Sequence, residues 1–334
     1  KYLSEHDNGV TNFHFEMAAE LLDEEMVRWL HTVRRGLFQF EIGVQSTNPD
    51  TLRAVQRVTL PEKLTPIIRA LQKGQNIHLH LDLIAGLPFE SYDRFGESYN
   101  YVYSLHPDQL QLGFLKLLKG SGLKQKQEEY GLVCRDDAPY EILCTPWLPY
   151  SDVLRLKRIE ELNELYYNSL RYQRELSFLI ERFSSPFRFF ESLSGFFEEN
   201  GFFSAPLAKM DTYNALYRFV REKGLDAERF SWLARYDMFA HEKVKKLPYW
   251  LSEGLKPRFH AAIYHFLDQP ENRTRWLPEY EDLTDTHQLI RNVHIEVFPF
   301  DPRTGADRET ALLFSYRRRT LDRNAAVFEI TLPV

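Results

Sequence analysis

Hydrophobic and polar residues alternate in four short stretches in the first third of the chain. The stretches span residues 12–16, 37–44, 77–84 and 109–117. In the second stretch, Phe38, Phe40 and Ile42 alternate with Gln39 and Glu41. Because successive side chains of a strand point to opposite faces, each stretch predicts a strand with one apolar and one polar face.

Segments with helical spacing separate these strands. Apolar residues recur three or four positions apart in residues 22–33, 64–71 and 92–102, and Gly36 and Gly74 interrupt the pattern. Strands that alternate with helices predict βαβ units and a parallel sheet. The apolar face would carry the helices, and the polar face would line the wet lumen of a partial parallel (βα) barrel. The alternative is an antiparallel sheet with one face in water.

The middle of the chain predicts mainly helices. After a proline-rich linker over residues 139–149, Ser151 begins one long helix that runs to Phe183. At ~1.5 Å per residue this helix would span roughly 45 Å if unbroken. The phenylalanine-rich residues 186–203 predict the core of short packed helices. Further helices are predicted over residues 212–223, 227–240 and 257–267.

The end of the chain predicts a small antiparallel sheet. Its strands span residues 293–298, 311–316 and 326–332, with turns at residues 301–305 and 322–324. The basic residues 317–319 are expected to form a solvated hairpin surface.

The predicted fold class is therefore α/β, with three parts. Residues 1–130 form the later half of a partial (βα) barrel, and residues 131–288 form a helix-rich α+β accessory domain. Residues 289–334 form the small antiparallel sheet.

Composition narrows the function classes. The 334 residues carry a net charge of -6, which argues against nucleic acid as the main partner. Neither an apolar run of the ~20 residues that span a bilayer nor a secretory signal is found, so a cytoplasmic location without a membrane partner is expected. Cys134 and Cys144 are the only cysteines, and their spacing fits neither a zinc knuckle nor an iron-sulfur loop.

Two segments resemble motifs of radical S-adenosylmethionine enzymes, especially the group that includes methylthiotransferases and oxygen-independent coproporphyrinogen oxidase. Residues 40–46 resemble the fourth barrel strand of that group. Residues 82–90 resemble the fifth, which reads aspartate, hydrophobic, isoleucine, any residue, glycine, hydrophobic, proline, glycine, glutamate. Residues 15–25 fit the third strand with its helix, and residues 115–121 fit the end of the sixth strand.

The four segments follow the order of the family. The later chain resembles the helix-rich C-terminal domain of unknown function found on some cobalamin-binding members. The resemblance implies a 4Fe-4S cluster held by three cysteines, and S-adenosylmethionine cleaved to a 5′-deoxyadenosyl radical. The cluster ligands are absent from this chain, so we expect Lys1 to lie inside a longer protein whose N-terminal segment is a partner of this one. Cobalamin is a possible further cofactor, and any domain that binds it would also lie upstream. The substrate, a small molecule or a peptide, is unknown.

The resemblance also assigns cofactor-binding roles on the polar face. Glu41 and Gln45 would bind ribose hydroxyls or the amino-acid part of the cofactor, and Glu16 would pair with its amino group or sulfonium. Asp82, the first residue of the fifth-strand motif, belongs to the same site.

The turn after the fifth strand would complete this site. Gly86 would let the backbone approach adenine closely, and Pro88 would set the turn. Phe89 departs from the family, which has glycine there, and this puts the path of the adjoining loop in doubt.

Two other functions stay open. His78 and His80 lie two apart on one strand face, with Asp82 extending the row, and could hold the metal of a hydrolase. His14 and Glu16 are the other isolated ligands on the polar face. The chain could instead be a binding or scaffold module without catalysis.

Overall fold

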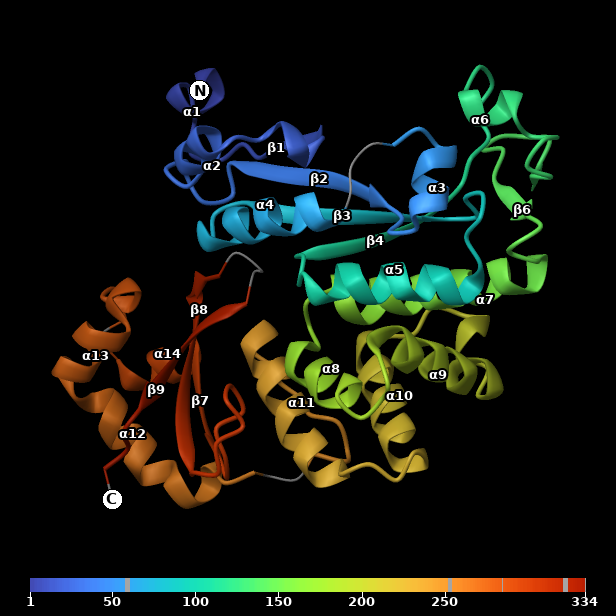
Figure 1. The fold of residues 1–334 in the computed structure, drawn as a ribbon. Coiled ribbons are helices and arrows are strands. Elements are labelled where there is room, and N and C mark those ends of the chain that lie inside the picture. Colours follow the sequence, from blue (N-terminus) through green and yellow to red (C-terminus); the bar gives the residue numbers. More distant parts are fainter. Residues whose placement is uncertain (58–60, 252–253, 284, 321–323, 334) are drawn as a thin grey trace. The chain divides into compact units, whose positions relative to one another are not determined.

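The computed structural model describes residues 1–334 except 58–60, 252–253, 284, 321–323 and 334 (Figure 1). Contacts divide the chain into two compact units. Unit 1 comprises residues 1–169 and 180–195, and unit 2 comprises residues 170–179 and 196–334. The three-part division at residues 130 and 288 is a different division, and it stays a prediction.

Unit 1 is built on a four-stranded parallel sheet with the strand order β1-β2-β3-β4. The strands are β1 (Phe13–Met17), β2 (Phe38–Gln45), β3 (His78–Ala85) and β4 (Gln109–Phe114). The helices are α1 (Tyr2–Glu5), α2 (Glu24–Leu30), α3 (Pro49–Ala54), α4 (Pro61–Lys73), α5 (Tyr92–Ser104), α6 (Gly122–Gln125) and α7 (Tyr150–Leu162). The short strands β5 (Val133–Cys134) and β6 (Ile142–Cys144) pair antiparallel.

The apolar face of the sheet is buried, as the alternation predicts. In β2 every second residue, from Phe38 to Val44, is buried, and the residues between are half-buried. Trp29 of α2 packs against Phe38 with ring centroids 6.2 Å apart. Leu64 and Ile68 of α4 are also fully buried. Burial of these apolar surfaces stabilises the sheet by about 25 cal/mol per Å² removed from water.

The two edges of the parallel sheet differ. The side chains of Asn163 and Asn168 satisfy the outer edge of β4: both donate to the carbonyl of Leu110, and Asn168 Oδ1 accepts from its N–H at 2.9 Å. Strand β1 is the other edge, and Phe15 on it is 38% exposed. The outer backbone groups of β1 are therefore available to another strand.

The single long helix predicted from residue 151 to residue 183 is wrong. Helix α7 continues into a π-helical turn, η2 (Asn163–Asn168), and the chain then breaks at Leu170, where φ is 57°. A new helix, α8 (Gln173–Ile180), follows. The break has a tertiary cause, because the asparagines of the π-turn bind the backbone of β4 rather than water.

Unit 2 contains the remaining helices and a three-stranded antiparallel sheet. The helices are α10 (Lys209–Glu222), α11 (Ala227–His241), α12 (His260–Asp268), α13 (Pro270–Trp276) and α14 (Thr286–Ile290), while α8 and α9 (Pro186–Glu199) each contain residues of both units. The strands are β7 (Val293–Phe298), β8 (Thr310–Arg319) and β9 (Ala325–Ile330), in the order β7-β8-β9. A buried Arg235 lies 3.6 Å from Glu296 and joins α11 to β7.

The predicted α/β fold class is confirmed, with a parallel βα sheet followed by a helix-rich part and a small antiparallel sheet. The predicted turn at residues 301–305 is present, where Asp301 accepts the backbone N–H of Arg303. Of the second predicted turn, residues 322 and 323 lie outside the described residues. Each helix within the described ranges is too short or too polar to cross a bilayer.

We expect the chain to self-associate through the outer edge of β1. An exposed parallel edge with an apolar side chain is a template for pairing with another strand. Phe15→Glu places a charge there and should lower the associated fraction, measured by light scattering at high protein concentration, by roughly half or more. Tyr249→Glu is the control, because Tyr249 is 83% exposed in unit 2 and lies on no strand. A monodisperse monomer for the unmodified chain would contradict this prediction.

Candidate functional site

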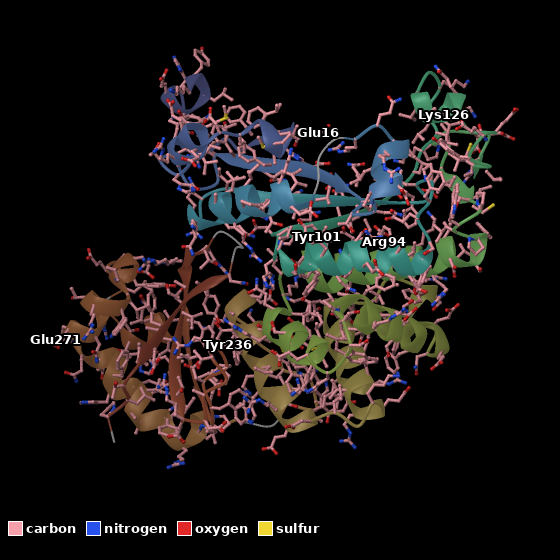
Figure 2. All side chains as sticks on the ribbon, in the orientation of Figure 1. Glu16, Arg94, Tyr101, Lys126, Tyr236 and Glu271 are labelled. Atoms are coloured by element: carbon pink, nitrogen blue, oxygen red, sulfur yellow. The ribbon has the colours of Figure 1, made fainter. Side chains whose placement is uncertain are left out.

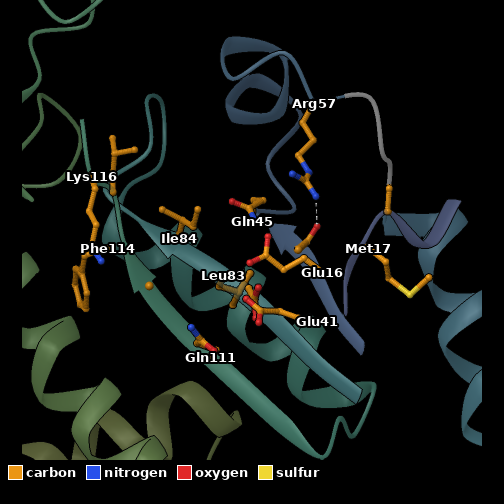
Figure 3. Close-up of a pocket in the computed structure, with 15 residues that line it drawn as sticks. Glu16, Met17, Glu41, Gln45, Arg57, Leu83, Ile84, Gln111, Phe114 and Lys116 are labelled. Atoms are coloured by element: carbon orange, nitrogen blue, oxygen red, sulfur yellow. Dashed lines mark hydrogen bonds between the residues drawn. The ribbon is translucent and has the colours of Figure 1, made fainter. Parts of the chain in front are cut away.

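A cavity of about 640 Å³ lies on the polar face of the parallel sheet (Figure 3). It is lined by residues from all four strands and from the segments that follow them: Glu16, Met17, Ala18, Glu41, Gly43, Gln45, Arg57, Asp82, Leu83, Ile84, Gln111, Gly113, Phe114, Leu115 and Lys116. Figure 2 marks Glu16 near the end of β1. The cavity therefore opens toward the carboxyl ends of the strands, where ligands of parallel α/β folds collect.

Parallel pairing in register gathers these side chains. Glu16 lies opposite Glu41, which in turn lies opposite His80. One step further along, Gly43 lies opposite Asp82, which lies opposite Gln111. Polar side chains from different strands thus form rows across one face, with their carboxylates and amides in the same cavity.

The end of β2 is shaped around Gly43. A side-chain carbon at this position would lie 2.4 Å from Nε2 of Gln45 and 3.0 Å from Nη2 of Arg57. Arg57 Nη2 donates to the carbonyl of Gly43 at 2.7 Å (Figure 3). Gln45 itself has φ of 68° and sits at a register shift in the pairing with β3. The glycine thus leaves the space that an amide and a guanidinium occupy at the mouth of the cavity.

Asp82 is the most perturbed acid of the cavity. The pKa of Asp82 is raised to about 8, mainly by burial and then by the charge of Glu41, a hydrogen bond with Glu41 and the charge of Glu16, while Arg57 opposes the shift. Asp82 is therefore protonated at pH 7 and donates to Glu41. Its Oδ1 is buried with no hydrogen-bond partner among the described residues, which is a costly state unless a ligand supplies one.

A buried carboxyl just beyond the cavity holds the two family-like segments together. Glu90 Oε1 accepts from Ser46 Oγ at 2.5 Å and from Ser98 Oγ at 3.3 Å. Ser46 follows β2, and Asn48 beside it donates to the carbonyl of Phe89. Burial raises the pKa of Glu90 to about 7, against the lowering effect of both serine hydrogen bonds. Ser46 and Glu90 lie in the two family-like motifs, at residues 40–46 and 82–90, but the sequence alone does not reveal their contact.

Gly86 and Pro88 occupy the turn after β3, and the described residues that line the cavity include neither. Gly86 has φ of 87°, and a side-chain carbon there would lie 2.7 Å from Ile142. The carbonyl of Pro88 accepts from Thr51 Oγ1 at 2.8 Å. Phe89 has φ of 64°, a conformation that favours glycine, so the loop keeps a left-handed residue where the family has glycine. The contacts at these positions are within the protein, and the predicted adenine contact stays a prediction.

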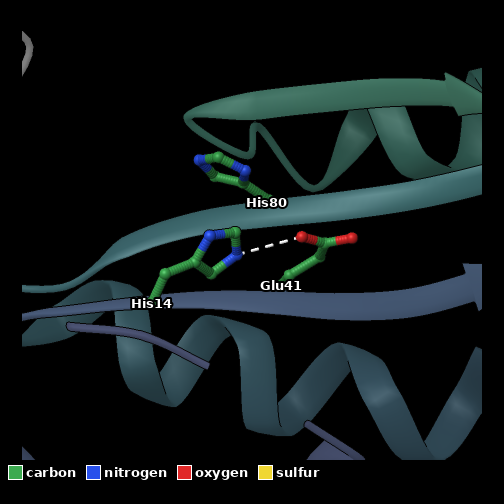
Figure 4. Close-up of side chains that lie close together, drawn as sticks. All are labelled: His14, Glu41 and His80. Atoms are coloured by element: carbon green, nitrogen blue, oxygen red, sulfur yellow. Dashed lines mark ion pairs between the residues drawn. The ribbon is translucent and has the colours of Figure 1, made fainter. Parts of the chain in front are cut away.

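Three possible metal ligands meet on the same face, nearer the amino ends of the strands (Figure 4). His14 Nε2 lies 2.9 Å from Glu41 Oε2, and one ligand atom each of His14, Glu41 and His80 lies within 4.8 Å of the others. The sequence singled out His78 and His80, whose ring nitrogens are 2.9 Å apart. The register between strands brings His14 and Glu41 close to His80. The spacing of residues along one strand does not reveal this group of three.

Comparison with known proteins finds a matching family and two curated relatives. A family described as Protein of unknown function (DUF4080) matches residues 128–314. The oxygen-independent coproporphyrinogen III oxidase of Pseudomonas aeruginosa is 34% identical over 77 residues, which are 23% of this chain and 17% of that protein. The probable threonylcarbamoyladenosine tRNA methylthiotransferase of Pyrococcus horikoshii is 27% identical over 106 residues, or 31% of this chain and 23% of that protein. This chain therefore spans less than a quarter of either relative.

Solved structures give weaker likenesses. Coproporphyrinogen III oxidase of Escherichia coli, described as a radical SAM enzyme, has a TM-score of 0.33 at 19% identity, over 44% of this chain and 31% of that chain. The radical S-adenosylmethionine methyltransferase TsrM of Kitasatospora setae has a TM-score of 0.27 at 11% identity, over 43% and 23%. The resemblance to radical S-adenosylmethionine enzymes predicted from the sequence is confirmed by the relatives found.

We expect Gly86→Ala to destabilise unit 1 more than Gly120→Ala. Both glycines have left-handed φ, which costs an alanine about 1–2 kcal/mol, but a side chain at Gly120 would meet nothing within 4 Å. At Gly86 the contact with Ile142 should add roughly 1–3 kcal/mol of overpacking. Urea unfolding of both variants measures the difference. Equal losses would mean that the close approach of Ile142 is unimportant.

Asp82→Asn should stabilise the protein increasingly as the pH rises. The raised pKa of Asp82 means that the folded state holds a proton which the unfolded state releases above about pH 4. Stability from this group is thus full below pH 4 and is lost as the pH rises toward 8. The difference in unfolding free energy between variant and unmodified protein should grow by more than about 1 kcal/mol between pH 5 and 9, since each unit of pKa shift is worth ~1.4 kcal/mol.

Asp7→Asn is the matched control for this pH series. A hydrogen bond from Arg34 lowers the pKa of Asp7, so its contribution is lost only below about pH 4 and should be constant over pH 5–9. Thermal unfolding at pH 5, 7 and 9 compares both variants. A constant difference for Asp82→Asn would show that Asp82 is ionised throughout.

Proposed function

This chain belongs to the family described as Protein of unknown function (DUF4080), and from that premise we propose that it is the later part of a radical S-adenosylmethionine enzyme. In this proposal the cavity of unit 1 binds the amino-acid part and sulfonium of S-adenosylmethionine. The substrate belongs to the proposal only as a small molecule or peptide of unknown identity.

The observation that carries the proposal is the charge pattern of the cavity. Glu16 and Glu41 supply carboxylates, and Arg57 and Lys116 supply cations on the same lining. S-adenosylmethionine carries an amino group and a sulfonium, both positive, and a carboxylate. Opposite charges placed around one cavity favour a ligand of this kind, because each charged group it buries meets a partner.

Asp82 supports the same ligand. Its Oδ1 is an unpartnered buried atom in a residue that lines the cavity. A bound amino group would donate to this oxygen and satisfy it. Gln45 and Gln111 add amide groups that donate and accept, as ribose hydroxyls require.

The iron-sulfur cluster does not fit this chain. Its two cysteines, Cys134 and Cys144, lie on β5 and β6, outside the residues that line the cavity. Three thiolates are needed for a site-differentiated cluster, so we place the ligands in another segment of the intact protein. When bound there, the cluster would supply the electron that cleaves the cofactor. Cobalamin, if used, belongs in this proposal to a further domain.

Binding of S-adenosylmethionine by the intact natural protein tests the proposal. We expect Glu16→Gln and Glu41→Gln each to weaken binding about 10-fold or more, because a hydrogen bond to a charged group is worth ~1.5–3 kcal/mol. Glu181→Gln is the matched control, since Glu181 also lies in unit 1 and its side chain is 78% exposed. Isothermal titration under anaerobic conditions measures all four proteins.

Two results would overturn the proposal. One is unchanged affinity in both cavity variants, which would move the cofactor elsewhere. The other is an intact protein that takes up no iron on anaerobic reconstitution, which would leave the scaffold hypothesis ahead.

A further inference from the structure

The polar face carries a second group of side chains with ligand chemistry, beside the proposed cofactor cavity. His14 comes from β1, Glu41 from β2 and His80 from β3 (Figure 4). His14 Nε2 and Glu41 Oε2 are 2.9 Å apart, and the rings of His14 and His80 have centroids 5.6 Å apart. One ligand atom from each residue lies within 4.8 Å of the other two.

This donor set matches the preference of a divalent transition metal. Two imidazoles and one carboxylate bind Zn²⁺ in catalytic sites, and the same set with open positions binds non-haem Fe²⁺. Metal–ligand bonds of ~2.0–2.2 Å require ligand atoms roughly 3.3 Å apart. The His14–Glu41 pair, at 2.9 Å, is slightly closer than that spacing.

To bind one ion, the three ligand atoms would move from within 4.8 Å of one another to the spacing of metal ligands. The side chain of His14 is 44% exposed on an edge strand and pairs with Glu41 Oε2. His80 is 7% exposed and held in place, with its Nε2 2.8 Å from Gln39 Nε2 and 2.9 Å from His78 Nδ1. These two contacts fix the orientation of the His80 ring.

We propose that His14, Glu41 and His80 bind one divalent transition-metal ion, Zn²⁺ or Fe²⁺, on the polar face of the sheet. Three protein ligands leave a fourth position for water or another small ligand. Glu41 is common to this site and to the proposed cofactor site, whereas His14 and His80 are not among the residues that line the cavity. An ion here would hold the Glu41 carboxylate in one orientation beside the cofactor cavity.

Zinc titration of the intact natural protein, stripped of metal and without iron reconstitution, tests this site. Because empty cluster cysteines also bind zinc, only zinc that is lost in the His14→Ala variant counts. We expect one such ion per chain and at least a 100-fold loss of affinity for it in His14→Ala and His80→Ala. His14 is exposed, so His14→Ala decides the matter if the buried His80→Ala variant fails to fold. Anaerobic Fe²⁺ titration then shows which ion binds more tightly.

Two variants sharpen the outcome. His78→Ala should weaken binding by roughly 10-fold, well below the loss in His14→Ala, because His78 contacts His80 rather than the ion. His265→Ala, an exposed histidine of α12, should change nothing. The proposal is overturned if His14→Ala binds as much zinc, as tightly, as the unmodified protein, and also if the loss in His78→Ala is as large as in His14→Ala. S-adenosylmethionine affinity measured on the same proteins separates this result from failure of the cofactor proposal.

Discussion

Parallel pairing in register is the constraint on which the rest of unit 1 depends. It converts a period of two along each strand into rows of like side chains across four strands. One face becomes apolar, and its residues on β2 are buried. The other face brings Glu16, Glu41 and Asp82 together, and a one-residue slip in any strand would exchange the two faces and destroy both the core and the cavity.

The polar face brings carboxyl groups close together, and their mutual repulsion determines its chemistry. Three carboxyl groups close together in a partly dehydrated cavity cannot all ionise, so the pKa of Asp82 rises and its proton is shared with Glu41. Arg57 and Lys116 offset the remaining negative charge. A positively charged ligand and a divalent cation both relieve the same repulsion. Both proposals draw on this one source.

The loops that follow β2 and β3 are held by a separate network. Glu90 binds Ser46 and Ser98, Asn48 binds the carbonyl of Phe89, and Thr51 binds that of Pro88. These contacts give a structural role to the positions of both motifs that do not line the cavity. A motif residue can hold two loops together or contact a ligand, and the sequence does not distinguish these two roles.

The sequence by itself determined the four parallel strands, their apolar and polar faces, the three terminal strands and the resemblance to radical S-adenosylmethionine enzymes. These properties are local, because periodicity, turn residues and short motifs are written within a few neighbouring positions. Only the tertiary structure decided that the helix from residue 151 breaks at a π-turn, since Asn163 and Asn168 find their partner in Leu110, more than fifty residues earlier. It also decided that His80 meets His14 and Glu41, because cross-strand register, unlike spacing along one strand, joins residues that are distant in the chain.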